Sequence, residues 1–226
     1  MAVGPLELYN TQRMSIPFSK IMSRWLPLIG FGGSRAYWER RYKLGGDSGT
    51  GSYGKASRYK AEVLNTFVAK HGISSIIEFG CVDGHQIYLA KYPSYLGVDV
   101  SADALERCRK IFSRDSQKSF ITLDEYNRQS ADLALSLDVI YHLVEDEVYW
   151  QYLAVLFSSA KRFVVIYSTS ADQPSDQLPH VRHRPVEKDI AARFPEFNRM
   201  ADEERGIPPP VVYSSNMPTR FLIYCR

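Results

Sequence analysis

Glu78-Phe79-Gly80-Cys81-Val82-Asp83-Gly84 is the stretch of this 226-residue sequence that decides its fold. It begins at the end of the strand-like run 74–79, which contains the β-branched Ile76 and Ile77, and it precedes an apolar helical segment. It therefore predicts a glycine-bearing turn between a strand and a helix. Such a turn lets the backbone approach a ligand closely. Asp99 ends the next strand-like run, Tyr95–Val100, where an acidic side chain can accept hydrogen bonds from ribose hydroxyls. The pair predicts an adenosine-binding α/β domain.

The spacing of the glycines selects among ligands that contain adenosine. A dinucleotide fingerprint has glycine at its first, third and sixth positions, which here are Gly80, Val82 and His85. Because two of the three positions do not match, binding of NAD or FAD is disfavoured.

The Glu-x-Gly-x-x-x-Gly spacing of Glu78, Gly80 and Gly84 resembles motif I of the class I S-adenosylmethionine-dependent methyltransferases, most closely their bacterial small-molecule and glycan type. The resemblance covers the chain from about residue 37 to the C-terminus. It implies S-adenosyl-L-methionine as the cofactor. It also implies a Rossmann-like α/β fold with a mostly parallel seven-stranded sheet, an antiparallel C-terminal strand and helices on both faces. Val82 departs from the family, which usually has a glycine there, and its side chain narrows the floor of the expected cofactor cleft.

Composition and charge favour one enzyme-sized domain. The net charge of +3 is small and no block of Lys and Arg occurs, which disfavours binding to nucleic acid. Cys81, Cys108 and Cys225 have no Cys-x-x-Cys spacing, which disfavours a disulfide framework and a zinc site. No apolar run reaches the roughly 20 residues of a membrane-spanning helix, and the N-terminus lacks a signal-peptide pattern. We therefore expect a cytoplasmic protein without stable membrane insertion.

We expect residues 1–35 to form an N-terminal arm, partly helical, and residues 36–226 to form the methyltransferase domain. The stretch Ile16–Phe31 mixes apolar and basic side chains, as a surface-lying helix does. Pro17 and Pro27 limit such a helix to little more than two turns. Contact with a membrane or partner and packing on its own domain are the two interpretations of this arm.

Strand-like and helix-like patterns alternate along the domain, which indicates parallel pairing of the strands. The strands are expected at 74–79, 95–100, 120–123, 133–139 and 162–167, and the helices at 102–112, 147–160 and 186–194. Two further strands, 211–214 and 220–224, flank a short turn and must run antiparallel.

The cofactor site is expected beyond the carboxyl ends of the parallel strands. Glu78 and Asp99 end two buried strands, where an acidic side chain is costly unless it is paired. By resemblance, Asp99 lies at the ribose and Asp124 at the adenine, although a surface turn is the alternative for Asp124. Leu137 and Asp138 then border the methionine and the sulfonium. The residues expected to bind the cofactor are Arg41, Glu78, Gly80, Cys81, Gly84, Asp99, Val100, Asp124, Leu137 and Asp138.

Upstream of the motif, an aromatic and basic segment at 37–42 runs into a glycine-rich loop at 45–54. No Gly-Lys-Ser/Thr ending follows, so the loop is not a P-loop. The segment resembles the region that closes over the cofactor in bacterial methyltransferases, which places Arg41 at the cofactor's carboxylate and Tyr53 in the cleft. Ordinary packing is the alternative for the aromatic residues.

The segment 132–142 resembles the family's fourth-strand motif, which often ends in a histidine. Methylation of a hydroxyl needs a base, and histidine titrates near neutral pH. His142 is therefore our expected catalytic base, and a structural role as a cap for Asp138 or for the helix near Glu147 is the alternative.

The loop after the fifth strand holds His180, His183 and Arg184, which together with Tyr53 we expect to bind the acceptor. These groups suit an acceptor that bears hydroxyls, a carboxylate or a phosphate, while an exposed basic loop is the alternative. The role of base moves to His183 if that side chain faces the sulfonium. No aspartate spacing for a metal is evident.

The resemblance implies methyl transfer to a small molecule, with a hydroxyl of a sugar or glycan as the expected acceptor. N-methylation of a small molecule remains open, as does a degenerate scaffold protein that binds the cofactor without turnover. Ser136-Leu137-Asp138-Val139 stands where amino methyltransferases of DNA bases and protein amides carry Asn/Asp-Pro-Pro-Tyr/Phe, which disfavours nucleic acid as the acceptor. The oligomeric state is left open.

Overall fold

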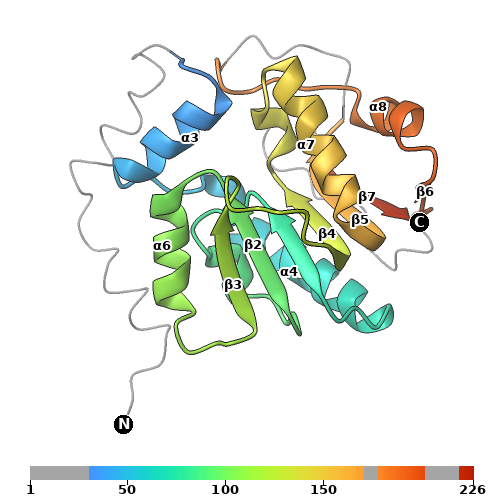
Figure 1. The fold of residues 1–226 in the computed structure, drawn as a ribbon, viewed down its shortest axis with the longest axis horizontal. Coiled ribbons are helices and arrows are strands. Elements are labelled where there is room, and N and C mark those ends of the chain that lie inside the picture. The colour runs from blue at the N-terminus through green and yellow to red at the C-terminus, as the bar shows by residue number, and fades with distance from the viewer. Residues whose placement is uncertain (1–30, 171–177, 202–218) are drawn as a thin grey trace.

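The computed structural model describes residues 31–170, 178–201 and 219–226. Residues 1–30 of the arm expected at 1–35 and the expected strand at 211–214 lie outside the described residues. The described chain forms one sheet with helices on both faces (Figure 1).

Within the part of the chain that the structure describes, the sheet has seven strands. In spatial order they are β3 (Lys118–Thr122), β2 (Tyr95–Asp99), β1 (Ile76–Phe79), β4 (Ala131–Leu137), β5 (Ala160–Thr169), β7 (Thr219–Cys225) and β6 (Asn198–Arg199). The first five in this order pair in parallel, whereas β7 runs antiparallel to both of its neighbours. The expected fold, mostly parallel with a reversed C-terminal strand, is confirmed.

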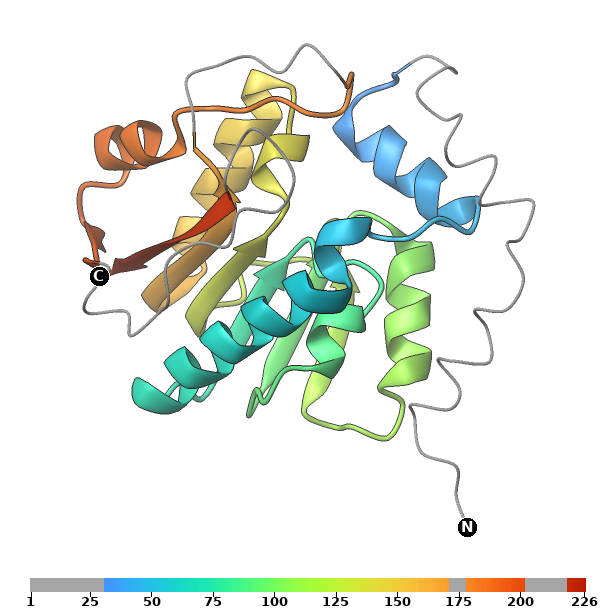
Figure 2. The ribbon, with the colours of Figure 1, turned by 180° about the vertical axis from the view of Figure 1, so that it is seen from behind.

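Helices cover both faces of the sheet (Figures 1 and 2). One face carries α4 (Gly54–Lys70), α5 (His85–Tyr88) and α6 (Ala102–Ile111), and the other carries α7 (Asp146–Ser158) and α8 (Val186–Arg193). Successive strand residues point to opposite faces, so Ile76 packs in the cluster that includes Leu64 of α4, while Ile77 packs with Leu153 of α7. Burial on both faces explains the continuous apolar runs of the central strands.

Helix α4 lies between the glycine-rich loop and β1, where the sequence patterns above predict no element. Its buried residues Leu64, Phe67 and Val68 pack in the same cluster as Ile76. The helix begins next to the carboxyl edge of the sheet, close to the short 3-10 turn η2 (Thr50–Ser52). It therefore places its first turns beside the expected site.

Helix α3 (Ser34–Lys43) lies across the carboxyl end of the sheet, near the N-terminus of α7 and the start of α6 (Figure 2). Ser34 ties it to the segment before α7, because its backbone N–H and its hydroxyl donate to Glu145 at 2.8 and 2.5 Å. Arg35 ties it to the loop after β3 through Asp124. Within the described residues, none of the helices has the length and apolar character needed to cross a membrane.

Candidate active site

The turn after β1 is built from residues in left-handed backbone conformation. Gly80, Val82 and Gly84 have φ angles of +79°, +52° and +86°. A Cβ at Gly80 would lie 2.4 Å from a methyl carbon of Val139, so glycine is required there. Val82 is the strained residue of the turn, because a side chain makes this backbone conformation unfavourable and a β-branched side chain makes it most unfavourable.

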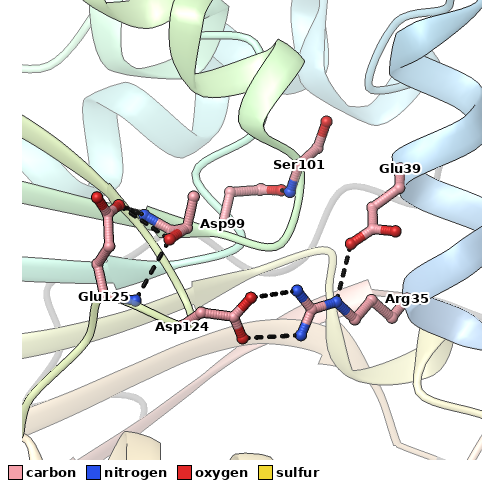
Figure 3. Close-up of polar contacts among 7 residues, drawn as sticks. Arg35, Glu39, Asp99, Ser101, Asp124 and Glu125 are labelled. Carbon is pink, nitrogen blue, oxygen red and sulfur yellow. Dashed lines mark hydrogen bonds and ion pairs between the residues drawn. The ribbon is translucent and has the colours of Figure 1, made fainter.

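Asp99 fixes the turn from the end of β2. Its Oδ2 accepts the backbone N–H of Val82 at 3.0 Å, and its Oδ1 accepts that of Ser101 at 2.9 Å. Figure 3 shows Asp99 beside Ser101. The side chain is buried, and burial raises the pKa of Asp99 to about 6 although the backbone N–H groups counteract this. A carboxylate has about four acceptor positions, and the backbone N–H groups of Val82, Ser101 and Val100 use three of them, so Asp99 can also accept a hydroxyl group.

Glu78 is fully buried at the end of β1. It accepts the Tyr95 hydroxyl at 2.7 Å. Burial raises the pKa of Glu78 to about 7, and the hydrogen bond from Tyr95 and the charge of Lys60 reduce that rise. The folded protein therefore carries a carboxyl group that titrates near neutral pH at the strand end expected to bind the cofactor.

Asp83 is a site residue that the sequence analysis did not single out. Its Oδ2 accepts hydrogen bonds from the backbone N–H and hydroxyl of Ser48, both at 3.2 Å, and from the Tyr53 hydroxyl at 2.5 Å. These bonds fasten the glycine-rich loop onto the turn after β1. The hydroxyl of Tyr53 is thus used to hold the loop. The position of Asp83 inside the motif was the signal that could have identified it.

Arg41 supports the same loop from α3. Its Nε donates to the backbone carbonyl of Asp47 at 2.6 Å, and its Nη2 donates to the Asp47 carboxylate at 3.2 Å. The guanidinium lies over the Trp38 ring, 5.6 Å from the centroid. The expected contact of Arg41 with the cofactor's carboxylate stays a prediction, and the contacts found here hold the loop.

Asp138 follows β4 with a φ of +59°, the left-handed region that a side chain disfavours. Its carboxylate accepts from the Lys60 ammonium at 2.5 Å and from the Tyr141 hydroxyl at 3.0 Å. Leu137, the residue before it, is buried in the core. The structure thus brings an aspartate, a lysine and a tyrosine together at the carboxyl end of β4.

His142 lies in the 3-10 turn η3 (Ile140–His142) after β4. Its Nδ1 is 3.0 Å from the backbone carbonyl oxygen of His180, and its ring stacks on the His180 ring with centroids 5.5 Å apart. A carbonyl oxygen only accepts, so Nδ1 carries the proton and Nε2 carries the lone pair. Burial lowers the pKa of His142 to about 4, so the ring is neutral at pH 7.

His180 supports His142 and α3. Besides its contacts with His142, its ring stacks on Tyr37 of α3 with centroids 4.3 Å apart. Both the carbonyl and the ring of His180 therefore contact His142, the candidate base. Binding of the acceptor by His180 stays a prediction, and the contacts found here join it to His142 and Tyr37.

His183 and Arg184 have different surroundings. His183 lies at the end of β5, where its Nδ1 is 2.6 Å from the Thr169 hydroxyl. Arg184 is buried and donates to Asp146 and to the carbonyls of Leu143 and Val144. Its guanidinium also lies over the Tyr149 ring at 4.4 Å. Binding of the acceptor by Arg184 stays a prediction, and the contacts found here hold the N-terminal end of α7.

Three further expected cofactor residues lie at the sheet edge or beneath it. Asp124 is exposed and forms a two-bond ion pair with Arg35, at 2.9 and 2.5 Å (Figure 3). This matches the surface alternative given above. Cys81 is buried with its Sγ against Gly97, where a Cβ would lie 2.7 Å away, so only its backbone faces the turn. Val100 follows β2, next to Asp99.

The acidic side chains of the site indicate which ligands it can bind. Glu78, Asp83, Asp99 and Asp138 are carboxyl groups at the ends of β1, β2 and β4. Carboxylates accept hydroxyl groups and favour cations, and they repel phosphates. Among the residues that the structure describes, no group of three or more His, Cys, Asp or Glu side chains is arranged to hold a metal ion.

The sequence matches no family model, and it matches no curated protein. The fold, however, is similar to that of solved methyltransferases. The N-methyltransferase NodS from Bradyrhizobium japonicum WM9, solved with S-adenosylhomocysteine, is 14% identical with a TM-score of 0.64, and the match covers 85% of this chain and 98% of NodS.

Two further structures give the same result. Magnesium protoporphyrin IX methyltransferase from Synechocystis PCC 6803, with bound S-adenosylhomocysteine, is 18% identical with a TM-score of 0.57, covering 92% of this chain and 99% of that enzyme. The methyltransferase domain of bacterial CtHen1 is 17% identical with a TM-score of 0.53, covering 75% and 98% of the two chains. At these identities the likeness establishes a Rossmann-like methyltransferase fold.

Proposed function

We propose that this protein is an S-adenosyl-L-methionine-dependent methyltransferase that methylates a hydroxyl of a small molecule, such as a sugar or glycan. The observation that carries the proposal is the buried Asp83 carboxylate in the turn after β1, at the start of α5. A dinucleotide places its pyrophosphate at this turn, where the carboxylate would repel it. A cofactor with a cationic sulfonium and an amino group suits the same carboxylates.

The chain's residues fit this cofactor. Asp99 can accept a ribose hydroxyl beside its backbone N–H partners, and the backbone of Gly80, Cys81 and Gly84 forms the close-approach turn. Glu78 and Val100 flank these groups, and Leu137 and Asp138 lie at the next strand end. Bound S-adenosyl-L-methionine supplies an electrophilic methyl group for transfer.

His142 is the proposed base. Its Nδ1 proton is committed to the His180 carbonyl, so Nε2 is the nitrogen that can take a proton from an attacking hydroxyl. Because the ring is neutral at pH 7, it adds no repulsion to a bound cation. An alkylamine acceptor is protonated at pH 7 and would lose a proton to the same nitrogen before it attacks. The tautomer of His142 therefore suits transfer to a hydroxyl, and the choice of a hydroxyl over an amine rests on the acceptor region.

The proposed acceptor region is polar. His183 and Thr169 at the end of β5 and Tyr141 in η3 offer hydroxyl and imidazole groups, and the rings of Tyr141 and His183 are 6.2 Å apart. Such groups suit an acceptor with several hydroxyls. The absence of a strongly basic composition argues against nucleic acid as the acceptor. The three cysteines are free, which supports the proposed cytoplasmic location.

The test is transfer of a labelled methyl group from S-adenosyl-L-methionine to matched pairs of compounds, each a polyhydroxylated molecule and its amino counterpart. We expect label on the hydroxyl compounds, and we expect its loss in His142→Asn, whose amide N–H can still donate to the His180 carbonyl. Label on amines alone would contradict the hydroxyl assignment. Cofactor binding without label on any of a broad acceptor set would favour the degenerate scaffold.

A further inference from the structure

Lys60 is a buried cation that nothing in the sequence patterns singled out. It lies in the second turn of α4, its side chain is 1% exposed, and its Nζ is 2.5 Å from Oδ2 of Asp138. It also lies 5.4 Å from the centroid of the Tyr167 ring in β5. A fully buried lysine is rare unless it is paired, so the position calls for an explanation from its surroundings.

Its partner Asp138 is hydrogen-bonded through both carboxylate oxygens and through its backbone N–H. Lys60 binds Oδ2, the Tyr141 hydroxyl donates to Oδ1, and the Asp138 N–H donates to the Tyr167 carbonyl at 2.9 Å. The glycine-rich loop approaches so closely that a Cβ at Gly51 would lie 3.1 Å from Oδ2. The carboxylate therefore has a fixed place between β4, α4 and the loop.

The Lys60–Asp138 pair is not explained by its contribution to the stability of the fold. A buried ion pair is often no more stabilising than apolar residues of similar volume, and Asp138 has a positive φ, which is uncommon for a residue other than glycine. Strained and buried charged groups persist at functional sites. Lys60 and Asp138 lie at the carboxyl edge of the sheet, where ligands bind in folds of this class.

We propose that Lys60 is a positioning residue that balances the charge of Asp138 at the methyl-transfer site. The inference rests on the proposed function, in which Asp138 borders the sulfonium. An unbalanced carboxylate there would stabilise the cationic cofactor before transfer more than after it, because the sulfonium charge is lost in the reaction. Binding that favours the ground state lowers KM without raising kcat. Lys60 prevents this by pairing with the carboxylate.

The test compares the dissociation constants of S-adenosylmethionine, which is cationic at sulfur, and S-adenosylhomocysteine, which is neutral there. Lys60→Met should favour the cationic ligand by at least about tenfold relative to the neutral one, which corresponds to about 1.4 kcal/mol. Asp138→Asn, which leaves Lys60 unbalanced, should shift the same ratio at least about tenfold in the opposite direction. The double variant, with a neutral pair, should return the ratio to near that of the wild type.

Kinetics provide a second readout. Lys60→Met should lower kcat and KM for S-adenosylmethionine together, the pattern of a tightened ground state. Lys70→Met, which removes an exposed lysine from the far end of α4, is the matched control and should leave the ligand ratio unchanged.

The outcomes separate the two proposals. Equal weakening of both ligands in Lys60→Met and Asp138→Asn would mean a purely structural ion pair and would overturn the role of Lys60, while the proposed function would stand. Failure of the wild-type protein to bind either ligand would overturn both. If Lys60→Met does not fold, the shift in Asp138→Asn and its reversal in the double variant decide the question.

Discussion

Replacement of Val82 by glycine should stabilise the protein. Val82 has a φ of +52°, and the left-handed region costs a residue with a side chain roughly 1–2 kcal/mol. Glycine removes that strain but adds about 0.5–1 kcal/mol of backbone entropy to the unfolded chain. The expected net gain is about 0.5–1 kcal/mol, or roughly 1–4 °C in Tm for a chain of this size.

The contacts of residue 82 support this calculation. Its N–H donates to Asp99 and its carbonyl accepts from the Cys108 thiol, and both groups belong to the backbone and survive the change. Urea unfolding followed by circular dichroism measures the gain. Arg128→Gly is the matched control, because Arg128 is exposed and has a similar φ of +57°.

Both glycine variants should therefore gain stability, and only Val82→Gly should change affinity for S-adenosylhomocysteine. We expect that change to stay below about tenfold, since Asp99 keeps its bond to the turn. Destabilisation of Val82→Gly by more than about 1 kcal/mol, with Arg128→Gly stabilised, would refute the strain argument. A much larger gain in affinity would indicate that valine closes the site and would favour the degenerate scaffold.

Three further predictions concern the ionisable groups of the site. Burial raises the pKa of Glu78 from 4.5 to about 7, so the folded state holds its proton more tightly and stability falls as pH rises between these values. Glu78→Gln should therefore raise Tm at pH 8, where it removes the cost of ionising the buried carboxyl, about 3 kcal/mol. It should not raise Tm at pH 4, and equal effects at both pH values would contradict this prediction. The pKa of Asp99 is raised to about 6, so affinity for S-adenosylhomocysteine should rise with pH through that value, and calorimetry should find no such rise in Asp99→Asn. His142→Asn should lower turnover by about 10²–10⁴-fold with little change in affinity for S-adenosylhomocysteine, and near-normal turnover in a radiolabel assay would remove His142 as the base.

The sequence predicted most of the fold because its central strands are buried on both faces. The apolar runs near β1, β2, β4 and β5 identified the parallel core, and β7 is the antiparallel C-terminal strand that the resemblance implied. Its expected partner at 211–214 lies outside the described residues. The first strand begins at Ile76 instead of residue 74, because the N–H and hydroxyl of Ser74 bond to Asp132. Helix α4 was not predicted, although its buried residues recur at helical spacing, because the prediction started from the motif that follows it.

The site was harder to predict, because its side chains pair over long distances in sequence. Lys60 binds an aspartate 78 residues away, and no local pattern reveals that a helical lysine will be buried. Arg184 was expected to bind the acceptor because it lies in a basic loop, and no local pattern indicated that it would pair with Asp146 at the start of α7. The residues of the turn and of the strand ends were easier to predict, because a strand end and a tight turn limit what each residue can do. They are Glu78, Gly80, Gly84 and Asp99.

The central claim is that the turn after β1 and the carboxylate of Asp99 bind S-adenosyl-L-methionine. Titration calorimetry with S-adenosylmethionine, S-adenosylhomocysteine and NAD, on the wild-type protein and on folded Asp99→Ala, tests it most directly. We predict roughly micromolar binding of both sulfur ligands, its loss in Asp99→Ala, and no binding of NAD. Binding of NAD, or binding of the sulfur ligands that is unchanged in Asp99→Ala, would contradict the account.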